Sequence, residues 1–140
     1  MKVLYRKDKE VAAWVAARIE GCERGFGACK ALGVVSNDRL IAGVVYHNWC
    51  PETGVIEISS AAISPRWATR SVLTELLNYP FSICRLVTAR FSEKNKRVEK
   101  LWRAFGAEFV RLPDVRAEDE AEIVALLKLT QWKKSRLYNG

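Results

Sequence analysis

Histidine is nearly absent from this chain, which has a single one among 140 residues. The four cysteines lie far apart and form no C-x-x-C pair, so the sequence predicts neither a zinc knuckle nor a thioredoxin-like site and gives no recognisable set of metal ligands. No apolar run reaches the ~20 residues of a membrane span, and the charged segment 6–10 stands where a signal peptide would have its apolar core. We therefore expect a soluble, cytoplasmic protein with no membrane partner.

Acidic residues are fewer than basic ones. The 16 Asp and Glu residues against 23 Lys and Arg residues give a net charge of +7. Such a balance favours an anionic partner, which can be a nucleic acid, an acidic protein or the phosphates of a cofactor. The length and the 49% of hydrophobic residues fit one globular domain over 1–140.

Hydrophobic periodicity and turn residues predict the element order β, α, β, β, β, α, β, α, β, β. Strands are expected over 2–6, 28–35, 40–49, 55–63, 84–91, 108–112 and 123–129, and helices over 8–19, 69–79 and 95–105. Asp8, Thr69 and Asn95 have the chemistry of helix caps, and Pro80 and Gly106 that of helix ends. An acidic loop over 114–120 and a basic tail from residue 130 complete this α/β prediction.

Two motifs lie in the segment 55–107. Ile63-Ser64-Pro65 ends the fourth predicted strand, and Asn95 opens a helix with Val98 and Leu101 on its apolar face that ends at 105–107. This arrangement resembles the coenzyme A-binding core of the GNAT acyltransferases. The resemblance implies the GNAT fold, a central mixed and mostly antiparallel sheet flanked by helices. It also implies acetyl-CoA, or another acyl-CoA, as cofactor and N-acyl transfer to an amine by direct attack.

The resemblance also places the cofactor. In such a fold the fourth and fifth strands part, and the pantetheine arm enters the gap like an additional strand. Backbone groups near Ala62 and Ile63 would pair with the arm, and one of their N–H groups would stabilise the oxyanion. The pyrophosphate would lie at the start of the following helix, where unpaired N–H groups attract anions. The side chains implied around it are Arg66, Thr69, Arg70, Ser71 and Asn95.

Two positions differ from the family pattern. The glycines of the usual pyrophosphate loop are missing from 68–73, so two hypotheses stay open: a site built from hydroxyl and guanidinium groups, or a non-catalytic binding protein that keeps the fold. The tyrosine that often protonates the leaving thiolate is replaced by Trp102, whose indole cannot do so. Tyr46, Tyr79 and Tyr138 are the alternative acids.

The base candidates are Glu57, Ser59 and His47. Glu57 and Ser59 alternate onto one face of the fourth predicted strand, and His47 lies near the end of the strand before it. A neutral imidazole or a carboxylate of raised pKa can take a proton from an attacking amine. A lone histidine is, however, often only structural, whereas a carboxylate in an apolar strand needs a partner, solvent or a proton.

Aromatic and basic residues suggest where the acceptor binds. Trp49 and Trp67 can line an acceptor pocket, and Trp67 with Arg66 and Arg70 suits nucleobases. The chain also resembles small GNAT-like proteins of tailed bacteriophages and, at fold level, the phage Mom group that modifies adenine in DNA. A Mom-like enzyme, working in the host cytoplasm, would use the lysines and arginines of 94–100 and 133–136 as a rim for phosphates. Solvated helix faces are the alternative for these charges, and the apolar strand 123–129 is a candidate homodimer interface.

Overall fold

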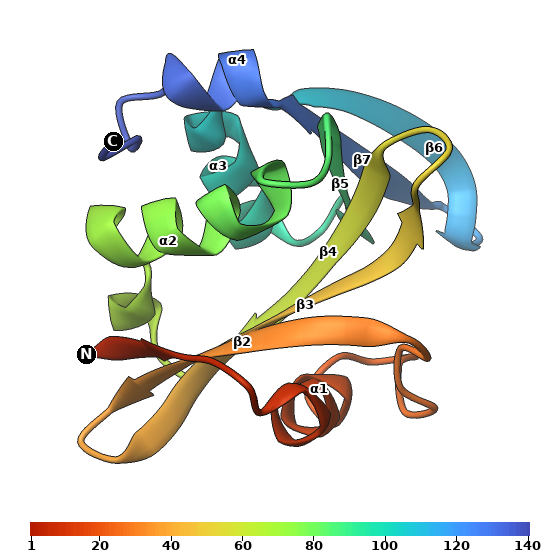
Figure 1. Ribbon diagram of the computed structural model, residues 1–140. Coiled ribbons are helices and arrows are strands. Elements are labelled where there is room, and N and C mark those ends of the chain that lie inside the picture. Colours follow the sequence, from red (N-terminus) through yellow and green to blue (C-terminus); the bar gives the residue numbers. More distant parts are fainter.

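The computed structural model describes residues 1–140 and has one seven-stranded sheet of order β1-β2-β3-β4-β5-β7-β6 (Figure 1). The strands are β1 Lys2–Leu4, β2 Cys29–Ser36, β3 Arg39–Cys50, β4 Val55–Ala62, β5 Leu86–Ser92, β6 Glu108–Ala117 and β7 Glu120–Lys128. All neighbouring strands are antiparallel except β4 and β5, which are parallel. The α/β class and the mostly antiparallel sheet are therefore confirmed.

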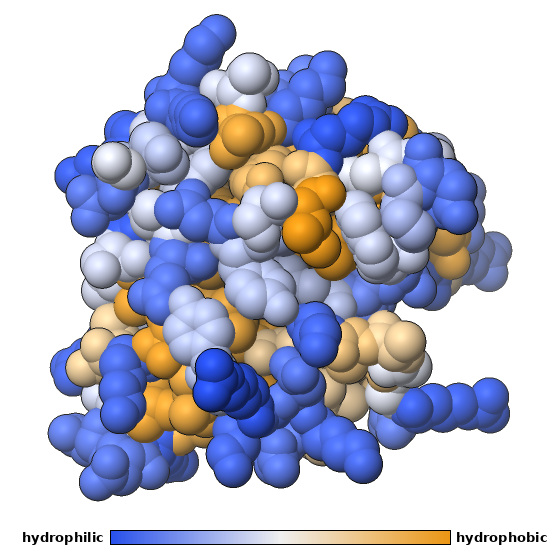
Figure 2. All heavy atoms as spheres, viewed as in Figure 1, coloured by the Kyte–Doolittle hydropathy of each residue, from blue (hydrophilic) through white to orange (hydrophobic).

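Helices lie on both faces of this sheet (Figure 1). They are α1 Asp8–Ala16, the 3₁₀ turn η1 Pro65–Trp67, α2 Arg70–Phe81, α3 Lys96–Phe105 and α4 Leu129–Lys133. The larger apolar core lies under α2 and α3, whereas α1 packs Val11 and Val15 against Ala31 and Val45 on the opposite face. None of the helices has both the length and the apolar character that a membrane crossing requires. Hydrophilic residues cover most of the face seen in Figure 2, and hydrophobic residues reach it in the middle and at the lower left.

The predicted order of helices and strands is confirmed, and so are the predicted caps at the starts of α2 and α3. The hydroxyl of Thr69 accepts a hydrogen bond from the N–H of Val72 at 3.2 Å, and Oδ1 of Asn95 accepts one from Val98 at 3.3 Å. Gly106 ends α3 with a φ of 98°, which is the left-handed conformation that glycine adopts without strain. Local sequence thus fixes where α2 and α3 begin.

Several predicted boundaries were wrong. Asp8 does not cap α1 but accepts a hydrogen bond from the N–H of Ala31 at 2.8 Å, which ties the helix to β2. Pro80 lies inside the last turn of α2, which ends at Phe81. The expected acidic loop is instead an extension of β6 to Ala117, because a register shift after residue 112 lets the β6–β7 ribbon continue. The basic tail begins with α4.

The strand predicted as a dimer interface has no free edge. β7 lies between β5 and β6, and its side chains Ile123, Ala125 and Leu127 are buried in the core of the chain. A second copy therefore cannot extend the sheet at 123–129, and the free edges are β1 and β6.

Candidate functional site

The two parallel strands at the centre of the sheet part after a short contact. β4 and β5 pair only over three positions, from Val55 with Leu86 to Glu57 with Thr88. Beyond them β4 continues with β3 as far as Ala62, and β5 continues with β7 as far as Ser92. A gap therefore opens between 58–62 and 89–92, with main-chain groups on both sides that no strand pairs.

The hydrogen-bond phase of β4 identifies the groups that face this gap. The N–H of Ile63 donates to the carbonyl of Ile41 at 2.9 Å, so odd-numbered residues of β4 point their main-chain groups toward β3. The N–H and C=O groups of Ser60 and Ala62 consequently point toward the gap. Ile63 cannot supply the oxyanion N–H that was predicted as an alternative to Ala62, but its side chain is 46% exposed at the end of the strand.

The start of α2 lies directly after β4 and η1. Thr69 satisfies the N–H groups of Val72 and Leu73 through its hydroxyl and its carbonyl, which leaves the N–H groups of Arg70 and Ser71 without an acceptor. The guanidinium of Arg70 donates to the carbonyl of Tyr138 at 3.1 Å, and the N–H of Arg66 donates to the Ser64 hydroxyl at 3.2 Å. This helix start is therefore an anion-binding geometry without glycines.

Seven of the basic residues predicted for the cofactor site or the phosphate rim have no acidic partner within 4.0 Å. They are Arg66, Arg70, Arg97, Lys100, Lys133, Lys134 and Arg136. Lys94 and Lys96, which were predicted to belong to a phosphate rim, pair instead with Glu120 and Glu99. Arg97 and Lys100 precede Ala104 on one side of α3, and Ala104 accepts a hydrogen bond from Ser135 of the C-terminal segment.

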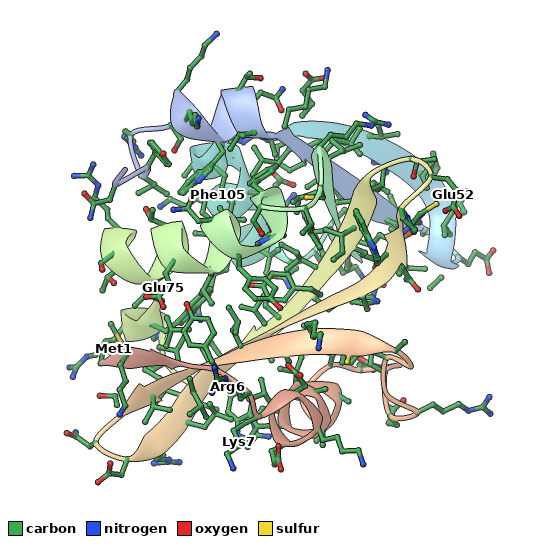
Figure 3. The ribbon with its side chains drawn as sticks, viewed as in Figure 1. Met1, Arg6, Lys7, Glu52, Glu75 and Phe105 are labelled. Atoms are coloured by element: carbon green, nitrogen blue, oxygen red, sulfur yellow. The ribbon has the colours of Figure 1, made fainter.

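Ser71 also lines a separate cavity of about 420 Å³ between α2, Tyr5 and Asn139. Within it the hydroxyl of Tyr5 donates to Glu75, and burial together with Glu75 raises the pKa of Tyr5 to about 12. Figure 3 shows Glu75 on α2, facing the chain around Arg6. The Ser71 side chain is therefore on the β1 side of α2, and only its N–H belongs to the helix start.

The three predicted base candidates come together on the face of the sheet that carries α1. Nε2 of His47 lies 2.9 Å from the hydroxyl of Ser59 and 3.9 Å from Oε2 of Glu57. Burial lowers the pKa of His47, and the nearby charge of Glu57 opposes this shift only in part. The imidazole is therefore neutral near pH 7 and can act as a hydrogen-bond acceptor or a base.

Asn48 is a member of this cluster that the sequence analysis missed. Its Nδ2 donates to Oε1 of Glu57 at 3.0 Å. Asn48 lies in a bulge of the strand between His47 and Cys50 and has a φ of 52°. An asparagine tolerates this backbone conformation, and the bulge turns its side chain toward Glu57. An asparagine directly after a lone histidine at a strand end was the only sequence signal for it.

Two of the aromatic candidates, Tyr46 and Trp67, are not placed for the tasks predicted for them. Tyr46 is buried on the opposite face of β3, where its hydroxyl donates to the carbonyl of Leu76 at 2.6 Å and burial raises its pKa well above the usual value. It cannot act at the Glu57 cluster. Trp67 packs partly against the main core instead of forming a free stacking surface, whereas Trp49 is 40% exposed at the end of β3. Trp102 is buried in the main core.

The opposite side of the gap carries a charged network on the same sheet face. Glu122 accepts hydrogen bonds from Arg90 at 2.9 Å and from Arg116 at 3.2 Å. Near it, Glu120 pairs with Lys94 at 3.4 Å. In the segment 17–28, burial and then Glu23 raise the pKa of the Cys22 thiol, whereas Arg116 lowers it and Glu57 raises it.

A mixed sheet whose only parallel pair splays apart, with a helix starting at the mouth of the gap, defines the GNAT acyltransferase fold. A spermidine N-acetyltransferase from Vibrio cholerae, the SpeG F149A mutant, matches with a TM-score of 0.71 and 11% identity over 96% of this chain and 98% of that one. A protein assigned to the GNAT family from Desulfovibrio desulfuricans matches with a TM-score of 0.61 and 17% identity over 71% and 69% of the two chains.

Some matched proteins are longer. A further matched structure is that of a protein named as an acetyltransferase. The present chain spans 62% of the length of that protein, with a TM-score of 0.64 and 15% identity. No protein-family model matches the sequence, and no curated protein matches it significantly. The likeness is therefore one of fold.

Proposed function

We propose that the chain is an acyl-CoA-dependent N-acyltransferase that moves an acyl group, with acetyl as first choice, to an amine. The observation that carries the proposal is the gap between β4 and β5, because it leaves the main-chain groups of Ser60 and Ala62 without strand partners. Free strand groups of this kind bind an extended ligand that offers amides. The matched V. cholerae protein is an N-acetyltransferase, which agrees with this interpretation.

The residues present fit coenzyme A. Ser60 and Ala62 would pair with its pantetheine amides, and the exposed side chain of Ile63 would cover them. The free N–H groups of Arg70 and Ser71 would hold the pyrophosphate without needing glycines. The side chains of Arg66 and Arg70, neither of which has an acidic partner within 4.0 Å, are available to the phosphates. When bound, acetyl-CoA supplies an activated thioester.

The acceptor side divides two tasks between neighbouring residues. Glu57 offers a carboxylate whose side chain is 19% exposed and has no Lys or Arg within 4.0 Å, so an ammonium group would neutralise it. The neutral His47, joined to the Ser59 hydroxyl, would accept one proton from the ammonium group, so that the neutral amine can attack the thioester carbonyl. The C–S bond then breaks, and the leaving thiolate of coenzyme A takes up the second proton that the nitrogen loses. Asn48 orients Glu57. Tyr46 takes no part.

The test is calorimetric titration with acetyl-CoA together with the initial rate of coenzyme A release in the presence of amines. We expect micromolar binding, and Glu57→Gln should lower kcat/KM for the amine by about 10- to 100-fold, the effect of losing one hydrogen bond between charged groups, with little change in cofactor affinity. Glu52→Gln is the matched control, since Glu52 is exposed in the β3–β4 turn (Figure 3). Unchanged turnover in Glu57→Gln would remove Glu57 from the reaction.

The other hypotheses give different results in the same experiment. Binding of acetyl-CoA without transfer to any amine would indicate a non-catalytic binding protein. Salt-dependent DNA binding without acetyl-CoA binding would favour a nucleic-acid partner. The matched acetyltransferases give no support to the Mom-like hypothesis, and the phosphates of a bound cofactor account for the basic side chains near α2.

A further inference from the structure

The two sides of the gap carry opposite net charge on one face of the sheet. We call Glu57 with its neighbours Ser59, His47 and Asn48 the acidic wall, and Arg90, Arg116 and Glu122 the basic wall. From these walls we infer that the acceptor amine also carries an anionic group, such as a carboxylate, at the other end of the molecule. The inference rests on the proposed function, and it names the class of acceptor.

Strand register places both walls on the same face. Glu57 is paired with Thr88, and Arg90 lies two residues further along β5, so the three side chains share one side of the sheet. Ser92 is opposite Glu122 in β7, which brings the carboxylate of Glu122 next to the end of β5. The intervening residues of β5, such as Ala89, are buried on the other side in the main core.

The acidic wall lacks a cation. The Glu57 carboxylate contacts the amide of Asn48 at 3.0 Å and Nε2 of His47 at 3.9 Å, and no Lys or Arg lies within 4.0 Å. Because the pKa of His47 is lowered by burial, the imidazole does not supply a positive charge near pH 7. A mostly buried carboxylate of this kind is stabilised by an ammonium ion that hydrogen-bonds to it.

The basic wall carries more positive than negative charge. Two guanidinium groups, those of Arg90 and Arg116, share the single carboxylate of Glu122, whose side chain is 11% exposed. Arg116 also lies 4.0 Å from Glu120, but Glu120 has Lys94 at 3.4 Å. Three cations against two carboxylates leave this side at +1. The Arg90 side chain is 50% exposed and uses one guanidinium N–H on Glu122, so most of its donors face solvent.

The segment 17–28 lies next to the acidic wall, because Cys29, which follows it directly, is paired with His47. Phe26 of this segment packs on the ring of His47 with 4.9 Å between ring centroids. Since Glu57 and Arg90 lie on one face of neighbouring strands, an acceptor bound in the gap next to His47 would meet Glu57 on one side and the arginines on the other.

This arrangement discriminates among amines by what they carry at the far end. An amine with a terminal carboxylate satisfies Glu57 and the free donors of Arg90 together. An alkylamine leaves those donors without a partner, and a diamine places a second ammonium group against a guanidinium. Each of the three compounds offers an ammonium group to the acidic wall, so a difference in their affinities reports the effect of the basic wall.

The experiment compares 4-aminobutanoate, butylamine and putrescine, which share a four-carbon chain and differ in the charge of the far end. Their dissociation constants are measured by NMR titration of the full chain saturated with coenzyme A. The same trio with six carbons covers a longer distance between the walls. We expect the best amino acid to bind about tenfold more tightly than the alkylamine and the diamine of equal length, as for one added charge-assisted hydrogen bond.

Arg90→Met tests the cause of the preference. We expect it to reduce the difference to about twofold or less, within the size of an exposed charge effect, while Arg90→Lys keeps a part of it. Arg103→Met is the matched control, because Arg103 forms an ion pair with Glu99 on α3, away from this face. The control should keep the full preference.

Three results would overturn the inference while leaving the proposed function intact: equal binding of the three compounds, tightest binding of the diamine, or no detectable binding of either amino acid to the coenzyme A-saturated protein. A preference that survives in Arg90→Met would also overturn it. If neither coenzyme A nor acetyl-CoA binds, the proposed function itself fails and the inference fails with it.

Discussion

Arg70 connects the candidate phosphate site to the C-terminal segment, and its replacement by alanine tests the cofactor site most directly. Its guanidinium donates one hydrogen bond to the carbonyl of Tyr138 and has no acidic partner within 4.0 Å. The remaining donors project from the first turn of α2, beside its free N–H groups. We expect Arg70→Ala to weaken acetyl-CoA binding.

The magnitude follows from the contacts of the side chain. A hydrogen bond to a charged group contributes about 1.5–3 kcal/mol, and the exposure of Arg70 reduces this to roughly 1–2 kcal/mol. The dissociation constant should therefore rise about 5- to 30-fold. Loss of the Tyr138 contact should lower the free energy of unfolding by about 1 kcal/mol or less, because its acceptor is neutral and the bond is exposed.

Calorimetric titration with acetyl-CoA at low and high salt, combined with urea unfolding, measures both quantities. Arg70→Lys should recover part of the affinity at low salt and lose it at high salt, because lysine keeps the charge without the guanidinium fork. Arg103→Ala is the control for removal of one positive charge from a helix. A dissociation constant that stays within twofold of the wild type, or an equal loss in both alanine variants, would refute a phosphate site at the start of α2.

Further predictions concern the acceptor side and the core. Because the pKa of His47 is lowered in the folded protein, the unfolded chain takes up this proton first as the pH falls, so the group contributes its full stability above about pH 6.5 and loses it at lower pH. His47→Gln should therefore reduce the change of the urea midpoint with pH between about pH 5.5 and 7.5, and an unchanged pH dependence would contradict this. Gly43→Ala should destabilise the fold by about 1–3 kcal/mol, since an added Cβ would lie 2.6 Å from Cγ2 of Val15 in α1; a denaturation midpoint equal to that of the wild type would show that α1 moves away freely. Cys84, whose thiol pKa burial raises to about 11, should not react with a thiol reagent at pH 8 until the protein unfolds. Rapid labelling of Cys84 in the native protein, distinguished by peptide mass spectrometry from that of the partly exposed Cys22, Cys29 and Cys50, would argue against its burial.

Local signals in the sequence were sufficient for much of the fold. Thr69 and Asn95 are caps because short hydroxyl and amide side chains satisfy N–H groups in the next turn, and Gly106 ends α3 because the left-handed conformation needs no Cβ. Local signals did not predict that β6 and β7 continue to pair beyond the register shift after Leu112. The acidic residues near Asp114 have the composition of a loop, yet β7 gives them a partner strand and β6 continues to Ala117.

The candidate site was predictable only in part. Alternation along β4 placed Glu57 and Ser59 on one face, and the structure places Nε2 of His47 at hydrogen-bond distance from Ser59 and 3.9 Å from Glu57. Tyr46 was predicted as an alternative acid, but successive residues of a strand point to opposite faces, so Tyr46 lies away from His47, and its hydroxyl donates to a carbonyl of α2. Asn48 was missed because a bulge, not its position in the sequence, turns it toward Glu57.

By itself, the sequence determined the order of helices and strands, because periodicity, caps and turns are local. It also determined the excess of basic residues. Only the tertiary structure decided that β4 and β5 part after Glu57, that the N–H of Ile63 is already used, and that Arg90 and Arg116 share Glu122. These features join residues distant in the chain, and they depend on strand order and register, which no local pattern fixes.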